Sequence, residues 1–161
     1  MSGKTIVSPL APNTYPTLPP IDGVMIGAYG AGLRYQGRDD LMLATLAPGS
    51  VIAGVLTRSK TASAPVEWCR KNLARGKVRA IIANAGNANA FTGKLGDRSV
   101  DESTRAVAQT IGCSRNEVFM ASTGVIGQPM TTEKIVAAVP KLAKLLRADG
   151  WMAAARAIMT T

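Results

Sequence analysis

The most informative absence in this chain of 161 residues is histidine, which does not occur at all. Without it there is no Ser-His-Asp or Cys-His catalytic arrangement and no imidazole ligand for a metal ion. The two cysteines, Cys69 and Cys113, stand far apart with no C-x-x-C spacing, so we expect reduced thiols in the core of a cytoplasmic protein. We therefore expect no metal site, and acid–base chemistry must use other groups.

Long apolar runs and clustered charge are also missing. No apolar stretch is long enough to cross a bilayer, and the N-terminal segment, broken by Pro9 and Pro12, lacks the pattern of a signal peptide. The net charge is +9, but the lysines and arginines are scattered, with no run of five. We favour a surface for small anionic substrates or an acidic partner subunit. A basic nucleic-acid-binding module is the alternative.

What the chain does contain is typical of a single globular domain. Apolar residues make up 47% and charged residues 18%, enough for one core within residues 1–161. Aromatic residues are only 4%, so this core must be mainly aliphatic. Five of the nine prolines fall within residues 1–20, which predicts an extended arm lying on the body of the protein.

Local patterns predict strands followed by helices. The expected strands cover residues 23–29, 41–46, 51–56, 78–83 and 117–121, the first three forming an antiparallel hairpin or meander. The expected helices run from Ser63 to Gly76, from a Ser99/Glu102 capping box to residue 111, from 132 with an interruption at Pro140, and over 151–158. This alternation predicts an α/β layered domain in which helices pack on a mixed β-sheet.

Two polar segments follow predicted strands, and the first is residues 84–90, NAGNANA. Its three asparagines, Asn84, Asn87 and Asn89, are separated only by Ala and Gly. Asparagine tolerates left-handed backbone and offers both an amide donor and a carbonyl acceptor. The segment either orients a substrate and braces a catalytic turn, or caps the chain that follows with its own side chains. Composition leaves both interpretations open.

The second polar segment lies within residues 120–130, MASTGVIGQPM. Thr123 and Gly124 fall where we expect a strand to turn sharply before a helix, an arrangement that exposes backbone N–H groups able to hold a developing negative charge. An ordinary strand-to-helix turn is the alternative. No residue is a convincing nucleophile: Ser122 and Thr123 have no base nearby in sequence, and Cys69 and Cys113 are expected in the core.

Three motifs occur together: NAGNANAFTG, then MASTGVIGQPM, then AIMTT at residues 157–161. In this order and spacing the chain resembles the family of bifunctional ornithine acetyltransferases of arginine biosynthesis, also called glutamate N-acetyltransferases. The likeness also includes the Pro-rich arm, GVMIGAYGAGLRY and DDLMLATLAPGSVIAGVLTRSKTASAPV.

The resemblance implies a self-cleaving precursor in which a new N-terminal Thr of the β-chain is the nucleophile and its α-amino group the base. Acetyl would pass from N-acetylornithine to that threonine and then to glutamate in a ping-pong transfer. No cofactor is implied, although some members accept acetyl-CoA as a substrate. The implied partners are the β-chain from the same precursor, in a heterotetramer of two α and two β chains, and these small substrates.

Residue by residue, Thr123 and Gly124 match the family's oxyanion hole, and Thr160, rather than Thr161, matches a substrate-binding threonine. Asn84, Asn87 and Asn89 match its Asn-rich loop, to which we assign a supporting role. This sequence lacks the family's Ala-Thr cleavage pair and a substrate-binding Lys, so we expect it to be the α-chain portion and inert alone. A self-cleaving aminopeptidase or amidase of the same layout is the nearest alternative.

Overall fold

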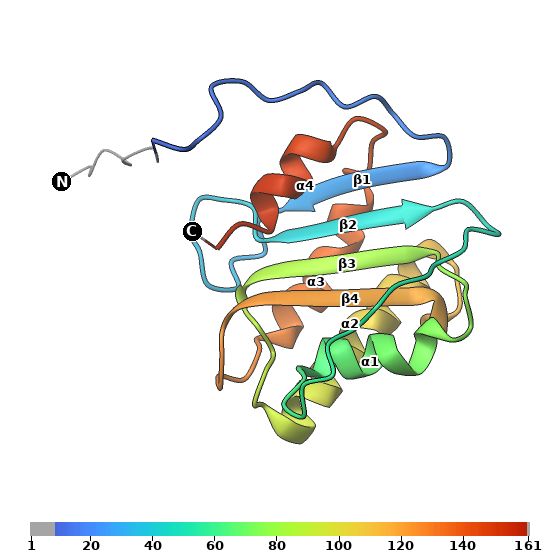
Figure 1. Ribbon diagram of the computed structural model, residues 1–161, viewed down its shortest axis with the longest axis vertical. Coiled ribbons are helices and arrows are strands. Elements are labelled where there is room, and N and C mark those ends of the chain that lie inside the picture. The colour runs from blue at the N-terminus through green and yellow to red at the C-terminus, as the bar shows by residue number, and fades with distance from the viewer. Residues whose placement is uncertain (1–8, 161) are drawn as a thin grey trace.

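The computed structural model describes residues 9–160, in which a four-stranded sheet is packed by helices (Figure 1). The strands lie in the order β1-β2-β3-β4; β1, β2 and β3 are antiparallel neighbours, and β3 and β4 are parallel. This confirms the predicted α/β domain with a mixed sheet. The elements are β1 (Val24–Tyr29), β2 (Leu41–Leu46), α1 (Ala64–Leu73), β3 (Ala80–Asn87), α2 (Gly93–Ile111), the 3-10 helix η1 (Arg115–Glu117), β4 (Val118–Val125), α3 (Thr132–Ala143) and α4 (Trp151–Ala157).

The two faces of the sheet bury different sets of side chains, as the alternation of a strand requires. Leu43 of β2 and Ile82 of β3 face α2 and α3 and lie in the main core with Val107 and Leu142. On the opposite face, α4 packs against β1 and β2 in a smaller cluster that includes Ala44. Aliphatic residues dominate both clusters, as the scarcity of aromatics predicted.

Helix α1 lies against the outer edge of β4 and covers its first half. The indole Nε1 of Trp68 donates to the carbonyl of Val118 at 2.8 Å, and the Cys69 thiol donates to the carbonyl of Met120 at 3.3 Å. Both carbonyls point away from β3, so α1 supplies partners that a fifth strand would otherwise provide.

The predicted strand over residues 51–56 is wrong. Only an isolated bridge between Val51 and Lys77 forms there, and the segment otherwise has no regular structure. Val51 and Val55 are 83% and 97% exposed. A strand needs a face to bury, and this segment has none within the described residues.

Helix α2 begins six residues earlier than predicted, at Gly93. Ser99 is therefore inside the helix and buried, and the predicted capping box is wrong. The capping box that does form joins Ser114 and Glu117 at η1. Gly112, in the left-handed conformation, ends α2 as expected.

Of the two expected effects of Pro140, a new helix or a kink in the old one, the first is wrong, because helix α3 continues through this residue. Pro140 lies on the exposed side, where the carbonyl of Val136 that loses its partner can meet water. Buried Val139 and Leu142 hold the helix on the sheet.

Residues 9–20 form neither helix nor strand, and in Figure 1 they run outside β1. The remainder of the predicted arm, residues 1–8, lies outside the described residues, as does Thr161. No helix in residues 9–160 has the length and apolar character needed to span a membrane.

Candidate active site

The residues singled out from the sequence gather at one end of the sheet. Strands β3 and β4 both end there, together with the loop between β1 and β2 and the C-terminal residues that follow α4 (Figure 1). Asn84 and Asn87 belong to β3, and Thr123 and Gly124 belong to β4. The predictions of a loop at residue 84 and a sharp turn at residue 123 are wrong, because the strands continue to Asn87 and Val125.

A pair of glycines lets the two strands continue side by side. Gly86 and Gly124 are register partners, and their φ angles are +100° and +133°. Residues other than glycine rarely adopt this backbone conformation. A Cβ at Gly124 would lie 2.6 Å from the backbone nitrogen of Asn87 and would also clash with the backbone of Gly86. The close approach of the neighbouring strand is therefore what requires glycine at position 124.

The buried side chain of Asn84 ties the strands together beside this pair. Its Oδ1 accepts a 2.6 Å hydrogen bond from the Ser122 hydroxyl, and its Nδ2 donates to the carbonyl of Asn87 at 2.9 Å. These bonds fix the residue that directly precedes Thr123. Hydrogen bonds inside a protein gain strength from the low local dielectric, so this contact is a rigid one.

Asn87 and Asn89 fasten the chain on either side of the strand ends. Asn87 Nδ2 donates to the carbonyl of Gln128 at 3.0 Å, in the turn after β4, and its Oδ1 accepts from the backbone N–H of Asn89 at 2.7 Å. Asn89 has φ of +47° and is fully buried. Its Nδ2 donates to Gly96 and its Oδ1 accepts from the Thr92 hydroxyl, at the start of α2. The asparagines therefore brace the turns from within.

The backbone of β4 exposes alternate groups at its outer edge. The Ala88 N–H donates to Val125 O, so Val125 faces β3. In a parallel ladder alternate residues face the same neighbour, so Thr123 also directs its N–H toward β3. The N–H groups of Ser122 and Gly124 then point away from β3. The bonds of Trp68 and Cys69 to the carbonyls of residues 118 and 120 follow the same alternation. Helix α1 covers those two residues, and by the same alternation the N–H of Gly124 is directed to the uncovered part of this edge.

Thr123 is exposed, and its hydroxyl has no hydrogen-bond partner in the described part of the chain. It lies next to the outward N–H of Gly124, so a hydroxyl donor and an amide donor are both available to a ligand at this open edge. Two such donors close together can stabilise an oxyanion.

Thr160 is brought to the same end of the sheet by the loop between β1 and β2. The Tyr35 hydroxyl donates to the carbonyl of Thr160 at 3.2 Å. The guanidinium of Arg38 stacks on the Tyr35 ring at 4.5 Å and donates to the carbonyls of Met159 and Arg156. The sequence did not reveal these hydrogen bonds, because they join residues more than a hundred positions apart.

Asp40 is another residue whose structural role the sequence did not reveal. It is fully buried, and its carboxylate accepts the backbone N–H groups of Ala31 at 2.7 Å and Leu33 at 2.6 Å. A buried carboxylate is tolerated only when it is well bonded, so Asp40 fixes the shape of this loop. The only local signal was the adjacent Asp39-Asp40 pair before a strand.

No nucleophile is activated within the described residues. Burial raises the pKa of the Cys69 thiol and of the Cys113 thiol, which disfavours the thiolate of each. The Ser122 hydroxyl donates to an amide oxygen, which is not a base. Residues 9–160 also hold no cluster of three or more acidic or thiol side chains placed to bind a metal.

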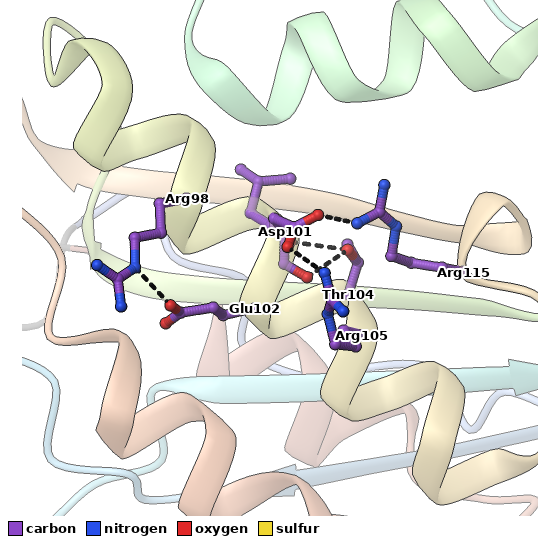
Figure 2. Close-up of polar contacts among 7 residues, drawn as sticks. Arg98, Asp101, Glu102, Thr104, Arg105 and Arg115 are labelled. Carbon is purple, nitrogen blue, oxygen red and sulfur yellow. Dashed lines mark hydrogen bonds and ion pairs between the residues drawn. The ribbon is translucent and has the colours of Figure 1, made fainter.

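A cleft of about 550 Å³ between α1 and α2 lies apart from these residues. Its wall contains a charge network in which Asp101 accepts from both Arg105 and Arg115, while Arg98 pairs with Glu102 (Figure 2). Arg115 also stacks on the Trp68 ring at 4.7 Å. These cations already have partners, so the network joins η1 and α1 to α2.

Comparison with known proteins identifies the family of this chain. The model of the ArgJ family matches residues 25–161. The chain is 50% identical over 155 residues to the arginine biosynthesis bifunctional protein ArgJ of Bradyrhizobium diazoefficiens, covering 96% of this chain and 38% of that protein. It is 53% identical over 163 residues to the protein of the same name from Ruegeria pomeroyi, covering 100% of this chain and 40% of that protein. The chain thus spans about two fifths of the length of these relatives.

Two crystal structures share the fold. Ornithine acetyltransferase from Mycobacterium tuberculosis, complexed with ornithine, has a TM-score of 0.84 and 35% identity, covering 88% of this chain and 77% of the other. The ArgJ protein from Bacillus halodurans has a TM-score of 0.81 and 30% identity, covering 87% and 73%. The resemblance drawn from the three sequence motifs is thereby confirmed, and the chain belongs to the ArgJ family.

Proposed function

We propose that this chain is the α-chain portion of an acetyltransferase that moves acetyl from N-acetylornithine to glutamate in arginine biosynthesis. The observation that carries the proposal is the uncovered edge of β4, where Thr123 is exposed and the alternation of the ladder directs the Gly124 N–H outward beside it. Family membership and the ornithine bound to the M. tuberculosis relative support the substrate class.

In this mechanism the hydroxyl of an N-terminal Thr, from a β-chain made by the same precursor, attacks the acetyl carbonyl. Its proton passes to its own α-amino group, and the oxyanion of the tetrahedral intermediate accepts hydrogen bonds from Thr123 and Gly124. Ornithine leaves with a proton, and an acetyl ester remains on the threonine. The amine of glutamate then attacks this ester, giving N-acetylglutamate.

The other predicted residues have supporting parts in this proposal. Thr160 contacts the substrate, and Asn84, Asn87 and Asn89 hold the strand ends that position Thr123. Acetyl-CoA serves, if at all, as an alternative acetyl donor. The working enzyme is a cytoplasmic heterotetramer of two α and two β chains.

The test is to express the full-length protein and identify every polypeptide in it by intact mass and N-terminal sequencing. We expect two chains, the second beginning with Thr, and transfer of acetyl from N-acetylornithine to glutamate. The present chain purified alone should be inactive, because the proposed nucleophile is on the other polypeptide.

A single uncleaved polypeptide without transferase activity would contradict the proposal. Hydrolysis of peptides with no transfer to glutamate would instead favour the aminopeptidase or amidase alternative.

A further inference from the structure

Arg34 is a cation at the proposed site with no acidic partner. It lies in the loop between β1 and β2, is exposed, and forms no ion pair within residues 9–160. Its one hydrogen bond runs from Nη1 to Oε1 of Gln128 at 3.3 Å. Since a guanidinium has five N–H donors, most of its bonding capacity is open to a ligand.

The fold holds Arg34 in place from both sides. The preceding residue, Leu33, packs against the main core and donates its backbone N–H to the buried carboxylate of Asp40. The following residue, Tyr35, is bonded through its hydroxyl to the carbonyl of Thr160. With both neighbours anchored, little backbone entropy is lost when a ligand binds the guanidinium.

The side chain of Arg34 packs on Gly86, one member of the glycine pair at the strand ends. A Cβ at Gly86 would lie 2.8 Å from Arg34 Cβ and 3.7 Å from its Cδ, so the aliphatic stem lies against Gly86. Gly86 is the register partner of Gly124, and Gln128 is in the turn that follows β4. The guanidinium therefore lies beside the turn that follows β4, while the next residue in the chain, Tyr35, contacts Thr160.

The other cations of this region are already engaged. Arg38 stacks on Tyr35 and donates to the carbonyls of Met159 and Arg156. Lys134, at the start of α3, donates through Nζ to the carbonyl of Gly32 at 2.5 Å. Arg34 differs from both because its charge is directed to no carbonyl of the loop.

We propose that Arg34 is a specificity-determining residue that binds the α-carboxylate of the amino-acid substrates. The inference rests on the proposed function: N-acetylornithine and glutamate use one site in turn, and the α-carboxylate is the anionic group they share. A guanidinium matches a carboxylate with two parallel hydrogen bonds, so it recognises this group whatever the side chain of the substrate.

The test compares N-acetylornithine with its α-carboxamide in the full-length protein. For the unaltered protein we expect kcat/KM to be about ten- to a hundredfold lower for the carboxamide, because a charge-assisted contact is lost. In Arg34→Gln, kcat/KM for N-acetylornithine should fall by a similar factor, and the difference between the two substrates should shrink to about threefold or less. Arg34→Lys should retain part of the difference, since it keeps the charge without the planar fork.

Arg75→Gln is the matched control, because it removes the same charge from an exposed arginine in the segment that precedes β3, whereas Arg34 contacts the end of that strand. It should leave the preference for the carboxylate unchanged. Full discrimination retained in Arg34→Gln, with an active unaltered protein, would overturn the assignment of Arg34 alone. An unaltered protein that transfers no acetyl from N-acetylornithine would overturn the proposed function and this inference together.

Discussion

The two halves of the β3–β4 pair share one register but have opposite chemistry. In the first half, residues 80–83 lie beside 118–121, and most of these side chains are buried and apolar. In the second half, residues 84–87 lie beside 122–125, and the same ladder contains two asparagines, a serine, a threonine and the Gly86–Gly124 pair. The backbone pairing is continuous, so side-chain chemistry alone separates a packing region from a candidate site.

The outer edge of β4 differs in the same way. Along the first half, Trp68 and Cys69 of α1 bond the outward carbonyls of Val118 and Met120. Along the second half the described residues show no bond from α1 to the strand. Thr123 is exposed there, and the alternation of the ladder directs the Gly124 N–H outward. One strand is thus held by α1 along its first half and left accessible along its second half, an arrangement that suits a site with fixed donors.

The largest effect on this arrangement should come from Gly124→Ala. The added Cβ would clash with the backbone of Gly86 and Asn87, at a φ that alanine rarely adopts, so we expect stability to fall by more than about 3 kcal/mol. Urea unfolding of the full-length protein measures it. Gly127→Ala, whose Cβ would have no neighbour within 4 Å, should cost only about 1–2 kcal/mol for its positive φ. Equal losses in the two variants would contradict the close strand contact.

A smaller effect is expected from Asn84→Ala, which removes the acceptor of Ser122 and the donor to Asn87. We expect a loss of about 2 kcal/mol in stability, and a fall in kcat beyond what unfolding explains, because Thr123 would no longer be fixed. Ile82→Val, in the apolar half, should cost about 1 kcal/mol with kcat unchanged. If both variants retained kcat, the polar residues of the second half would contribute to stability and not to catalysis.

The smallest expected effect is on the reactivity of Cys69, which tests whether α1 shields the first half of the β4 edge from solvent. Burial raises the pKa of its thiol, so at pH 8 the native thiolate fraction is lower than in the unfolded chain. In a Cys113→Ser background, alkylation of Cys69 by iodoacetamide should be slower in the native protein than in urea. In the native protein it should become faster only when the pH rises above the ordinary pKa of a thiol. The linked stability is present below the unfolded pKa and is lost as pH rises through the folded one. Equal rates at pH 8 would show the edge to be open.

Hydrophobic periodicity and local turn signals were sufficient to predict much of the fold. The strands near residues 24 and 41 and the helix that Gly112 ends follow from patterns within a few residues. The extent of β3 and β4 did not, because Asn, Gly and Ser normally mark loops. Each strand continues only because the other offers a glycine at the same register position, and a single sequence does not reveal that pairing.

The same limit applies to the candidate site. Thr123 and Gly124 were named from the expected turn after a strand, and the family resemblance gave them a role and added Thr160. The structure brings all three to one end of the sheet. Asp40 and Arg34 were not named, since the burial of one and the open guanidinium of the other depend on residues far away in sequence. The Ser99 capping box failed for a related reason, because tertiary packing extended α2 past a strong local signal.

The most direct test of an oxyanion-binding edge is the turnover number of Thr123→Val in the full-length, self-cleaved protein. The change keeps the shape of the side chain and removes only the exposed hydroxyl. We expect kcat for acetyl transfer to fall by about two to three orders of magnitude, with the urea midpoint unchanged and with Thr123→Ser retaining most of the activity. A Thr123→Val protein with unaltered kcat would contradict the assignment of this edge as the oxyanion site.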